Sequence, residues 1–389
     1  MNLTLILSCL GERGNSSRSQ LAKLTGLTKA TVSSLIKELI ERKFVREIGL
    51  ASPGIGRPSM KLEINPQAGS IIGAEIGVDF ISVILTNFSA EILYRETIRT
   101  TDLQGDQEAI LTRAVSLLGR TVEQARESGL GLLGIGMGAP GLVDASSGVL
   151  LFAPNLKWRD VPLRKILESK FSYPVYVENE ANMATLGEST FGAGRDARYV
   201  LYVSAGVGLG GGIVVNKQLL QGSSGFAGEI GHMTIEPHGE PCNCGNTGCW
   251  ETLVSQRAVF KRIREAALQQ DTVLNDRLEG MVFMDVVAAA RQGDAVTLAA
   301  LNETGRHLGT GIANLVNALD PEMVIFGGIL SLASEFILPA IQAEVDARAL
   351  LWSRRNTRIE IARHGSGACM IGGVATVYHR ILSHPTLRV

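Results

Sequence analysis

The sequence has no long uninterrupted apolar run, and this absence excludes a membrane-spanning protein. Its two most apolar windows, residues 71–88 and 312–341, both contain acidic residues, whereas a membrane-spanning helix needs about 18 consecutive apolar residues. An export signal is not expected either, because no basic residue precedes the apolar segment Leu3–Leu7 and Glu12 and Arg13 soon follow it. We therefore expect a short apolar helix here and a cytoplasmic protein.

Cysteines are also scarce, with five in 389 residues, and their spacing does not fit a disulfide framework. Cys9 and Cys369 stand alone, while Cys242, Cys244 and Cys249 lie close together. A cluster of this kind is typical of a metal site in a reducing compartment.

His232 supplies a fourth ligand for this cluster. Three thiols and one imidazole suit tetrahedral zinc, and the Cys-x-Cys-x4-Cys spacing lets a short glycine-containing loop wrap around the ion. Four protein ligands leave no open coordination position, so the zinc is expected to be structural. Two alternatives stay open here: His238 in place of His232, and three buried cysteines that bind no metal.

Charge is distributed unevenly along the chain. The net charge is −1, but residues 1–66 contain ten basic and five acidic residues, and residues 67–389 contain 27 and 33. A small basic module attached to a larger acidic one is typical of a DNA-binding domain joined to a ligand-binding domain.

Residues 17–43 have the pattern of two helices joined by a tight turn. Ser17 and Gln20 form a capping-box pattern, and Leu21 and Leu24 are expected to give the first helix its inward face. The apolar residues of the second helix recur at the spacing of one buried stripe: Val32, Leu35, Ile36, Leu39 and Ile40.

The opposite face of this second helix is polar, small and basic, which suits entry into the major groove of DNA. Its candidate DNA-binding residues are Thr28, which is also the expected N-cap, Lys29, Ala30, Thr31, Ser33, Ser34 and Lys37. The alternative is a helical hairpin whose basic face is only solvated.

A wing is expected next to this helix. Residues 44–48 and 61–64 have the pattern of paired strands, and the loop 50–60 between them is rich in glycine and proline. Arg57 on this loop could reach a phosphate or a narrow minor groove. Together these features predict a winged helix-turn-helix.

The remainder of the chain has an α/β pattern. Strands are expected at 71–78, 81–87, 92–98 and 132–137, with a helix at 107–128. Several strands run into glycine-rich turns, where the backbone can approach a small molecule closely, at residues 134–141, 204–212 and 327–328. Each turn alone is more often a tight connection than a binding loop.

Four motifs in this part carry a resemblance to a known family: GAPGLVD (138–144), APNLKW (153–158), ENEANMATLGE (178–188), and the segment 228–251 with GEIGHM and CNCGNTGCWE. The chain resembles the ROK family of sugar kinases and repressors. The segment TGLTKATVSSLIKELIERKFV and the GRP at 56–58 are similar to its repressor branch, and to xylose repressors in particular.

The resemblance implies a fold and an assembly. The fold is a two-lobed, actin-like ATPase (ribonuclease H-like) sugar-kinase fold that follows the winged helix-turn-helix, and the chain would form a homodimer or a dimer of dimers. We expect a DNA-binding domain at 1–65 and a sugar-kinase-like domain at 66–389. Its first lobe would span about 66–189 plus the C-terminal helix, and its second about 190–367.

The resemblance also implies a sugar site in the cleft between the lobes. Its residues would be Gly141, Asn155, Asn179, Glu180, Glu229, His232 and Glu251. Carboxylates and amides that converge from several loops suit the adjacent hydroxyls of a sugar. His232 could bind zinc through one ring nitrogen and a sugar hydroxyl through the other.

Two departures from the family's kinases argue against phosphoryl transfer. Where those kinases have Asp-x-Gly-Gly-Thr for the ATP phosphates, residues 75–79 read EIGVD, which adds a branched side chain and a negative charge. Glu180 replaces the catalytic Asp, and the extra methylene displaces the carboxylate. We therefore assign no catalytic residue.

The sequence predicts a repressor of a carbohydrate-utilisation operon whose partners are operator DNA and a sugar effector. The alternative is an ATP-dependent sugar kinase with a regulatory DNA-binding head.

Overall fold

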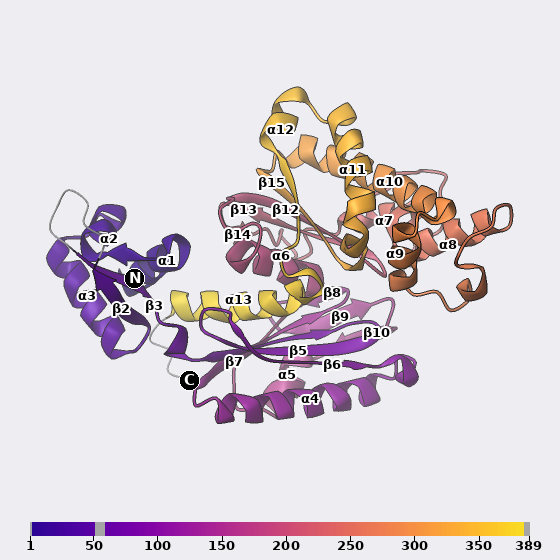
Figure 1. The fold of residues 1–389 in the computed structure, drawn as a ribbon. Coiled ribbons are helices and arrows are strands. Elements are labelled where there is room, and N and C mark those ends of the chain that lie inside the picture. Colours follow the sequence, from indigo (N-terminus) through magenta and orange to yellow (C-terminus); the bar gives the residue numbers. More distant parts are fainter. Residues whose placement is uncertain (1, 51–58, 385–389) are drawn as a thin grey trace.

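The computed structural model describes residues 2–50 and 59–384 of the chain. A small N-terminal module, indigo in Figure 1, lies beside a larger body of two lobes. The described part of the module contains three helices and a sheet of order β1-β3-β2. Its elements are α1 (Asn2–Arg13), β1 (Ser16–Ser17), α2 (Arg18–Thr25), α3 (Lys29–Glu41), β2 (Val45–Leu50) and β3 (Met60–Ile64).

Local signals in the sequence place the two helices of the helix-turn-helix. Ser17 Oγ accepts a hydrogen bond from the Gln20 N–H, and the Gln20 side chain accepts one from the Ser17 N–H, so the capping box is confirmed. Gly26 ends α2 at a φ of 71°, a left-handed conformation that glycine adopts without strain. Thr28 caps α3 by accepting a hydrogen bond from the Thr31 N–H.

One expectation for α2 is wrong. Leu21 is fully buried, but Leu24 is 39% exposed. A step of three residues turns a helical side chain about 60° away from its starting direction. In a helix of eight residues, this rotation takes Leu24 off the face that meets the core.

The hairpin of β2 and β3 follows α3 in antiparallel register, from Val45 opposite Ile64 to Leu50 opposite Met60. Arg57 and the rest of the expected wing loop, residues 51–58, lie outside the described residues.

The first lobe of the body is built on a five-stranded sheet of order β11-β7-β4-β5-β6. Its strands are β4 (Ser70–Ile76), β5 (Phe80–Asn87), β6 (Ile92–Arg99), β7 (Leu132–Ala139) and β11 (Val175–Asn179). The first three pair antiparallel, and β7 and β11 run parallel to β4. Strand β4 ends two residues earlier than expected, because the Gly77 N–H donates to the Phe80 carbonyl and closes a turn.

The second lobe repeats this topology in a sheet of order β14-β13-β12-β15-β16. Three strands again pair antiparallel and two run parallel to the first of them. The strands are β12 (Tyr199–Ala205), β13 (Leu209–Val215), β14 (Gln218–Leu219), β15 (Met323–Gly327) and β16 (Arg358–Ile361). Two sheets of one topology are the duplication that a two-lobed actin-like fold requires.

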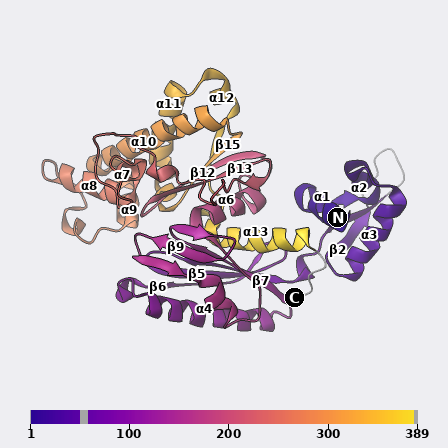
Figure 2. The ribbon, with the colours of Figure 1, turned by 180° about the vertical axis from the view of Figure 1, so that it is seen from behind.

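Helices α6 (Glu180–Phe191) and α13 (Ala368–Ser383) lie between the two sheets, as Figure 1 and Figure 2 show. Glycines bring their backbones unusually close to their neighbours. A Cβ added to Gly73 of β4 would overlap the Met370 carbonyl oxygen, and one added to Gly372 would overlap the Met183 carbonyl oxygen. Without these glycines the middle layer could not be this thin.

The outer helices cover the other faces of the two sheets. Helix α4 (Gln107–Glu127) buries one stripe against the first sheet, and the second sheet shares its core with α10 (Ala295–Leu319) and α11 (Ser334–Arg348). The remaining elements are β8 (Leu142–Asp144), β9 (Val149–Ala153), β10 (Trp158–Val161), α5 (Leu163–Glu168), α7 (Trp250–Val254), α8 (Gln256–Ala267), α9 (Phe283–Arg291) and α12 (Leu351–Asn356). No helix in the described ranges is long and apolar enough to cross a membrane.

The N-terminal module shares a hydrophobic core with the body. Ile6, Leu7 and Leu10 of α1 belong to one buried cluster with residues of α3, β4 and α13. Aromatic rings continue this contact in a series, with centroid distances of 6.0 Å from Phe44 to Phe88, 5.1 Å from Phe88 to Tyr378, and 5.2 Å from Tyr378 to Phe191. The module is therefore attached by packing as well as by the chain.

Candidate functional site

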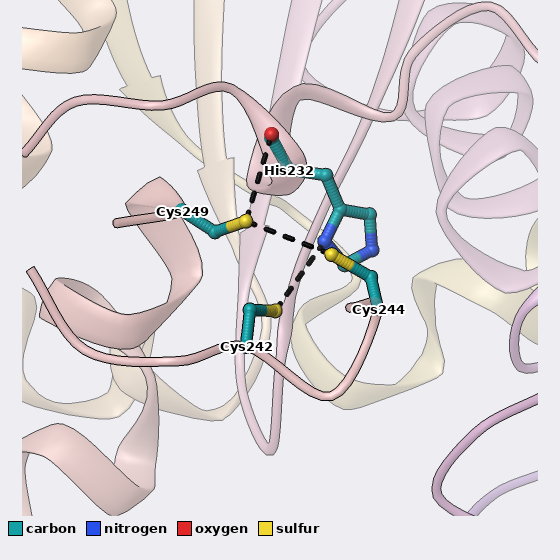
Figure 3. A group of neighbouring side chains, drawn as sticks. All are labelled: His232, Cys242, Cys244 and Cys249. Carbon is teal, nitrogen blue, oxygen red and sulfur yellow. Dashed lines mark hydrogen bonds between the residues drawn. The ribbon is translucent and has the colours of Figure 1, made fainter. Parts of the chain in front are cut away.

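The expected metal ligands come together in one cluster. The ligand atoms of His232, Cys242, Cys244 and Cys249 all lie within 4.8 Å of one another, and Figure 3 shows the four side chains pointing toward a common centre. His238 is exposed and does not belong to this group.

The geometry of the cluster fits tetrahedral zinc. The Cys244 and Cys249 sulfurs are 3.7 Å apart, and the Cys242 sulfur is 3.7 Å from His232 Nδ1. Zinc–sulfur bonds of about 2.3 Å give a tetrahedron edge of about 3.8 Å. A disulfide would need a sulfur separation of about 2.05 Å. These two distances are close to the edge of a zinc tetrahedron, so the four residues are placed to hold a zinc ion.

The other ring nitrogen of His232 lies near a carboxylate. His232 Nε2 lies 4.0 Å from Glu229 Oε2. Because Nδ1 points to the cysteines, a metal bound there would leave the proton on Nε2. Nε2 and the Glu229 carboxylate could then contact the same ligand hydroxyl.

The metal loop rests on a buried tryptophan. Trp250 is fully buried, and its indole N–H donates to the His307 carbonyl oxygen at 2.9 Å. A Cβ added to Gly311 of α10 would overlap the Trp250 ring. This contact fixes the start of α7, where Cys249 and Glu251 flank the tryptophan.

Glu251 connects the metal loop to a glycine-rich turn. Its carboxylate accepts a hydrogen bond from the Leu209 N–H at 2.9 Å and lies 3.7 Å from the Cys242 sulfur. Leu209 lies within the glycine-rich SAGVGLGGG segment, residues 204–212. Glu251 therefore holds this turn and the metal loop together.

Asn179 caps α6 and contacts two other expected sugar-site residues, Gly141 and Glu180. Its Oδ1 accepts hydrogen bonds from the N–H groups of Ala181 and Asn182, and its Nδ2 donates to the Gly141 carbonyl oxygen at 2.9 Å and to Glu180 at 3.1 Å. All hydrogen-bonding groups of this amide are thus occupied. Its effect is to position Glu180 beside Gly141, whose φ of 90° favours glycine.

Glu180 lies in an acidic and buried environment. Burial, with smaller contributions from the nearby carboxylates of Glu75 and Glu229, raises the pKa of Glu180 to about 8. A carboxyl group with this pKa is mostly neutral at pH 7. It can then donate a hydrogen bond as well as accept one.

Glu75 and Cys369 lie near Glu180, and sequence reasoning missed both. Burial raises the pKa of Glu75 to about 7, and the buried Cys369 thiol lies near this carboxyl group. A Cβ added to Gly138 would overlap the Cys369 sulfur, so α13 reaches the first sheet here. Glu75 opens the EIGVD segment, which was considered only for its missing phosphate contacts.

Asn155 is the one expected sugar ligand that the described contacts do not connect to the others. It is exposed, between β9 and β10, and forms no hydrogen bond with the described residues. Its place in the site remains a prediction.

The expected DNA-binding face of α3 is accessible. Val32, Ile36 and Leu39 are buried, while Thr31 is partly exposed and the others are exposed: Thr28, Lys29, Ala30, Ser33, Ser34 and Lys37. Lys37 lies 3.9 Å from Glu41 in an exposed ion pair, which contributes little to stability.

Comparison with known proteins agrees with this architecture. Residues 71–380 match the ROK family, and residues 2–49 match the IclR helix-turn-helix domain. The xylose repressor of Caldicellulosiruptor bescii is 37% identical over 388 residues, which cover 99% of this chain and 97% of that protein. The glucokinase of Halalkalibacterium halodurans is 37% identical over 307 residues, which cover 78% of this chain and 93% of that protein.

Among solved structures, a ROK family transcriptional regulator, described as a homologue of the E. coli MLC protein, superposes with a TM-score of 0.82 at 25% identity. The match covers 98% of this chain and 97% of that one. The expected two-lobed fold with an N-terminal helix-turn-helix is thereby confirmed. With its body matched over residues 71–380 and a relative aligned along nearly its whole length, the chain belongs to the ROK family.

Proposed function

We propose that this protein is a DNA-binding transcriptional repressor whose affinity for operator DNA is controlled by a sugar bound between the two lobes. The observation that carries the proposal is that one chain combines a helix-turn-helix module with a ROK body. The xylose repressor of C. bescii aligns with this chain over nearly the whole length of both proteins.

The exposed face of α3 is the proposed contact with the major groove. Its N-terminal residues are small, hydroxylic or basic, which allows close approach to base edges and phosphates. Arg57, outside the described residues, is proposed to contact the backbone or minor groove. A symmetric dimer would present two such helices to a palindromic operator.

The cleft is proposed to bind the sugar. Glu180, Glu229, His232 and Glu251 are its proposed ligands, because paired oxygen and nitrogen atoms match adjacent hydroxyl groups. Xylose is the proposed effector, because relatives that match nearly the whole chain are named xylose repressors. Zinc at the His232 and cysteine cluster is proposed to be structural, and this reduced cluster agrees with a cytoplasmic location.

Phosphoryl transfer is not proposed. The ring of Phe80 covers Gly77 in the turn that would have to approach the phosphates, since a Cβ on Gly77 would overlap that ring. Asp79 is exposed on the same turn and adds a negative charge. The pKa of Glu180, raised to about 8 mainly by burial, also leaves little of the base form at neutral pH.

The proposed mechanism couples cleft closure to DNA binding. A sugar that contacts both lobes favours the closed cleft, and closure changes how the two modules of a dimer are spaced. Operator half-sites have a fixed spacing, so the affinity for DNA falls. Coupling of this kind typically changes affinity about 5- to 150-fold.

The test measures the affinity of the full-length protein for a DNA site selected from a random library, with and without saturating xylose. We expect Glu229→Ala and Glu180→Ala to bind this DNA as the wild type does, but to lose most of the response to xylose. Glu279→Ala, an exposed carboxylate outside the cleft, serves as the matched control. Full response in both cleft variants would show that the effector binds elsewhere.

The alternative is a sugar kinase with a regulatory head, which the similarity to a glucokinase favours. A coupled ATP assay with xylose, glucose and N-acetylglucosamine distinguishes the two. Turnover at about 1 s⁻¹ or faster, as in ordinary enzymes, would support the kinase.

A further inference from the structure

A second cavity, of about 670 Å³, lies where the N-terminal module meets the body. Its walls come from α1, β11, α6, the turn between β13 and β14, and α13. Among the described residues, none of the proposed sugar or metal ligands lines it. Its volume is in the usual range for small-molecule sites, about 300–1,000 Å³.

Among the charged residues that line this junction cavity, cations outnumber carboxylates. Four of its residues are cationic, Arg164, Arg195, Lys217 and Arg380, whereas the single carboxylate is Glu178. Glu178 already accepts hydrogen bonds from the Asn179 N–H and from the side chains of Asn182 and Gln221. An anion placed in the cavity would therefore meet an excess of positive charge.

Arg195 is the cation best placed to bind such an anion. Its guanidinium group is exposed and forms no hydrogen bond or ion pair with any described residue. Arg164, by contrast, donates to three backbone carbonyl groups, and Arg380 lies over the Tyr176 ring at 5.6 Å. A free guanidinium beside a cavity suits bidentate contact with a phosphate or carboxylate.

Polar groups in the wall have hydrogen-bonding capacity that the protein does not use. Asn182 and Ser189 are 4% and 7% exposed, and neither Asn182 Oδ1 nor Ser189 Oγ has a hydrogen-bond partner among the described residues. Buried polar atoms nearly always have a partner. Both residues line the cavity, so these two unpartnered polar atoms belong to residues of its wall.

We propose that this junction cavity binds a small phosphorylated sugar or polyol, with Arg195 and Arg380 contacting the phosphate and Asn182 and Ser189 contacting hydroxyl groups. This site is a second effector site, separate from the sugar cleft. Its existence does not depend on whether the chain is a repressor.

The cavity contacts both the N-terminal module and the helix that begins at the proposed sugar site. Ser8 of α1 lies on one wall, and Ser189 and Thr190 near the end of α6 lie on another. The first residue of α6 is Glu180 in the sugar cleft. A ligand that contacts α1 and α6 together would hold the N-terminal module in one orientation on the body.

The test is isothermal titration of the full-length protein with ribose 5-phosphate and glycerol 3-phosphate, and with ribose, glycerol and inorganic phosphate for comparison. We expect at least one phosphorylated compound to bind more tightly than both its parent alcohol and inorganic phosphate. Arg195→Ala should weaken this binding tenfold or more, and Arg380→Gln should weaken it as well. Arg257→Ala, which removes an exposed arginine on α8, should have no effect.

Hydrogen exchange of α1 amides provides a second readout, because the bound compound should slow exchange in this helix. The proposal is overturned if no phosphorylated compound binds at millimolar concentration, or if inorganic phosphate binds equally well. It is also overturned if Glu229→Ala abolishes binding while Arg195→Ala does not, since the compound would then occupy the sugar cleft.

Discussion

At the scale of single residues, burial decides what the carboxyl groups of the cleft can do. Glu75 lies on β4 and Glu180 on α6. Burial is the main cause of the raised pKa of both groups, and the Glu75 carboxylate makes a smaller contribution to the pKa of Glu180. A neutral carboxyl group donates a hydrogen bond that a carboxylate cannot donate. The cleft is therefore suited to hydroxyl recognition near neutral pH and less suited to proton abstraction.

Glu75→Gln should change the pH dependence of stability. Burial raises the pKa of Glu75 to about 7 from an ordinary value near 4.5. The stability that comes from the neutral form is complete below about pH 4.5 and is lost as pH rises through 7. Glutamine is neutral throughout, so the variant should gain roughly 2–4 kcal/mol relative to wild type between pH 5 and pH 8.

Urea unfolding of the variant and the wild type at pH 5 and at pH 8, without sugar, measures this difference in stability. Besides burial, the groups that influence the pKa of Glu75 are Cys369 on α13 and Arg95 on β6, and both are retained in the variant. Glu279→Gln on the surface is the control. An equal difference between variant and wild type at pH 5 and pH 8 would contradict the prediction.

Cys244→Ser should reduce both zinc content and sugar affinity. The Cys244 sulfur lies 3.7 Å from Cys249 in the cluster, and Glu251 follows on the same segment. Loss of one thiolate weakens metal binding, and the loop that carries Glu251 then loses its anchor. Elemental analysis should find about one zinc per chain in wild type and much less in the variant.

Cys9→Ser is the control, because it removes a cysteine outside the cluster. Zinc absent from wild-type protein prepared without chelators would refute the assignment of the cluster.

At the scale of elements, the thin middle layer depends on glycines of α13. Gly372 lies against the Met183 backbone, and Gly373 lies against the backbone of Gly136 in β7. These contacts bring α13 within backbone distance of α6 and of the first sheet. Helix α13 is thereby held to the first sheet and to α6 by backbone contact.

Gly372→Ala should destabilise the protein despite the higher helix propensity of alanine. The added methyl group overlaps the Met183 carbonyl, and overpacking of this kind typically costs about 1–3 kcal/mol. Gly119→Ala on α4 is the matched control. No atom lies within 4 Å of its added Cβ, so it should stabilise by up to about 1 kcal/mol.

Chemical unfolding of the two variants and wild type provides the comparison. If Gly372→Ala were as stable as Gly119→Ala, α13 would not be held by backbone contact.

At the scale of the whole molecule, the N-terminal module and the body form a continuous structure. Phe44 belongs to the module, Phe88 and Tyr378 to the body, and Phe191 to the end of α6. The first residue of α6 is Glu180, a proposed sugar ligand. A movement of α6 on sugar binding would therefore shift Phe191 and the aromatic rings that connect it to the N-terminal module.

Phe88→Leu should weaken the coupling between sugar and DNA. Phe88 is fully buried between Phe44 and Tyr378, and the smaller side chain removes both ring contacts. We expect a loss of about 1–3 kcal/mol in stability and a smaller change in DNA affinity on addition of xylose.

Phe283→Leu in the core of the second lobe is the matched control, since it is equally buried but distant from the module. If both variants reduced the response equally, the aromatic contacts would have no specific part in coupling.

The sequence by itself determined the local elements of this protein. The caps at Ser17 and Thr28, the stripe of α3 and the strands of the first lobe depend on short-range periodicity and hydrogen bonding, which are readable from neighbouring residues. The metal ligands were predictable for the same reason, because His232 and the three cysteines lie within one short segment. Leu24 shows the limit of this reasoning, since a short helix does not bury every apolar residue on it.

Only the tertiary structure decided which distant residues meet. Glu75 and Cys369 are nearly 300 residues apart in the chain, and no periodicity connects them. The core shared by α1 and α13 and the cavity beside it likewise join the two ends of the described chain. Such contacts depend on how two sheets and their helices pack, and packing is set by the shapes of all the surfaces together and not by any local pattern.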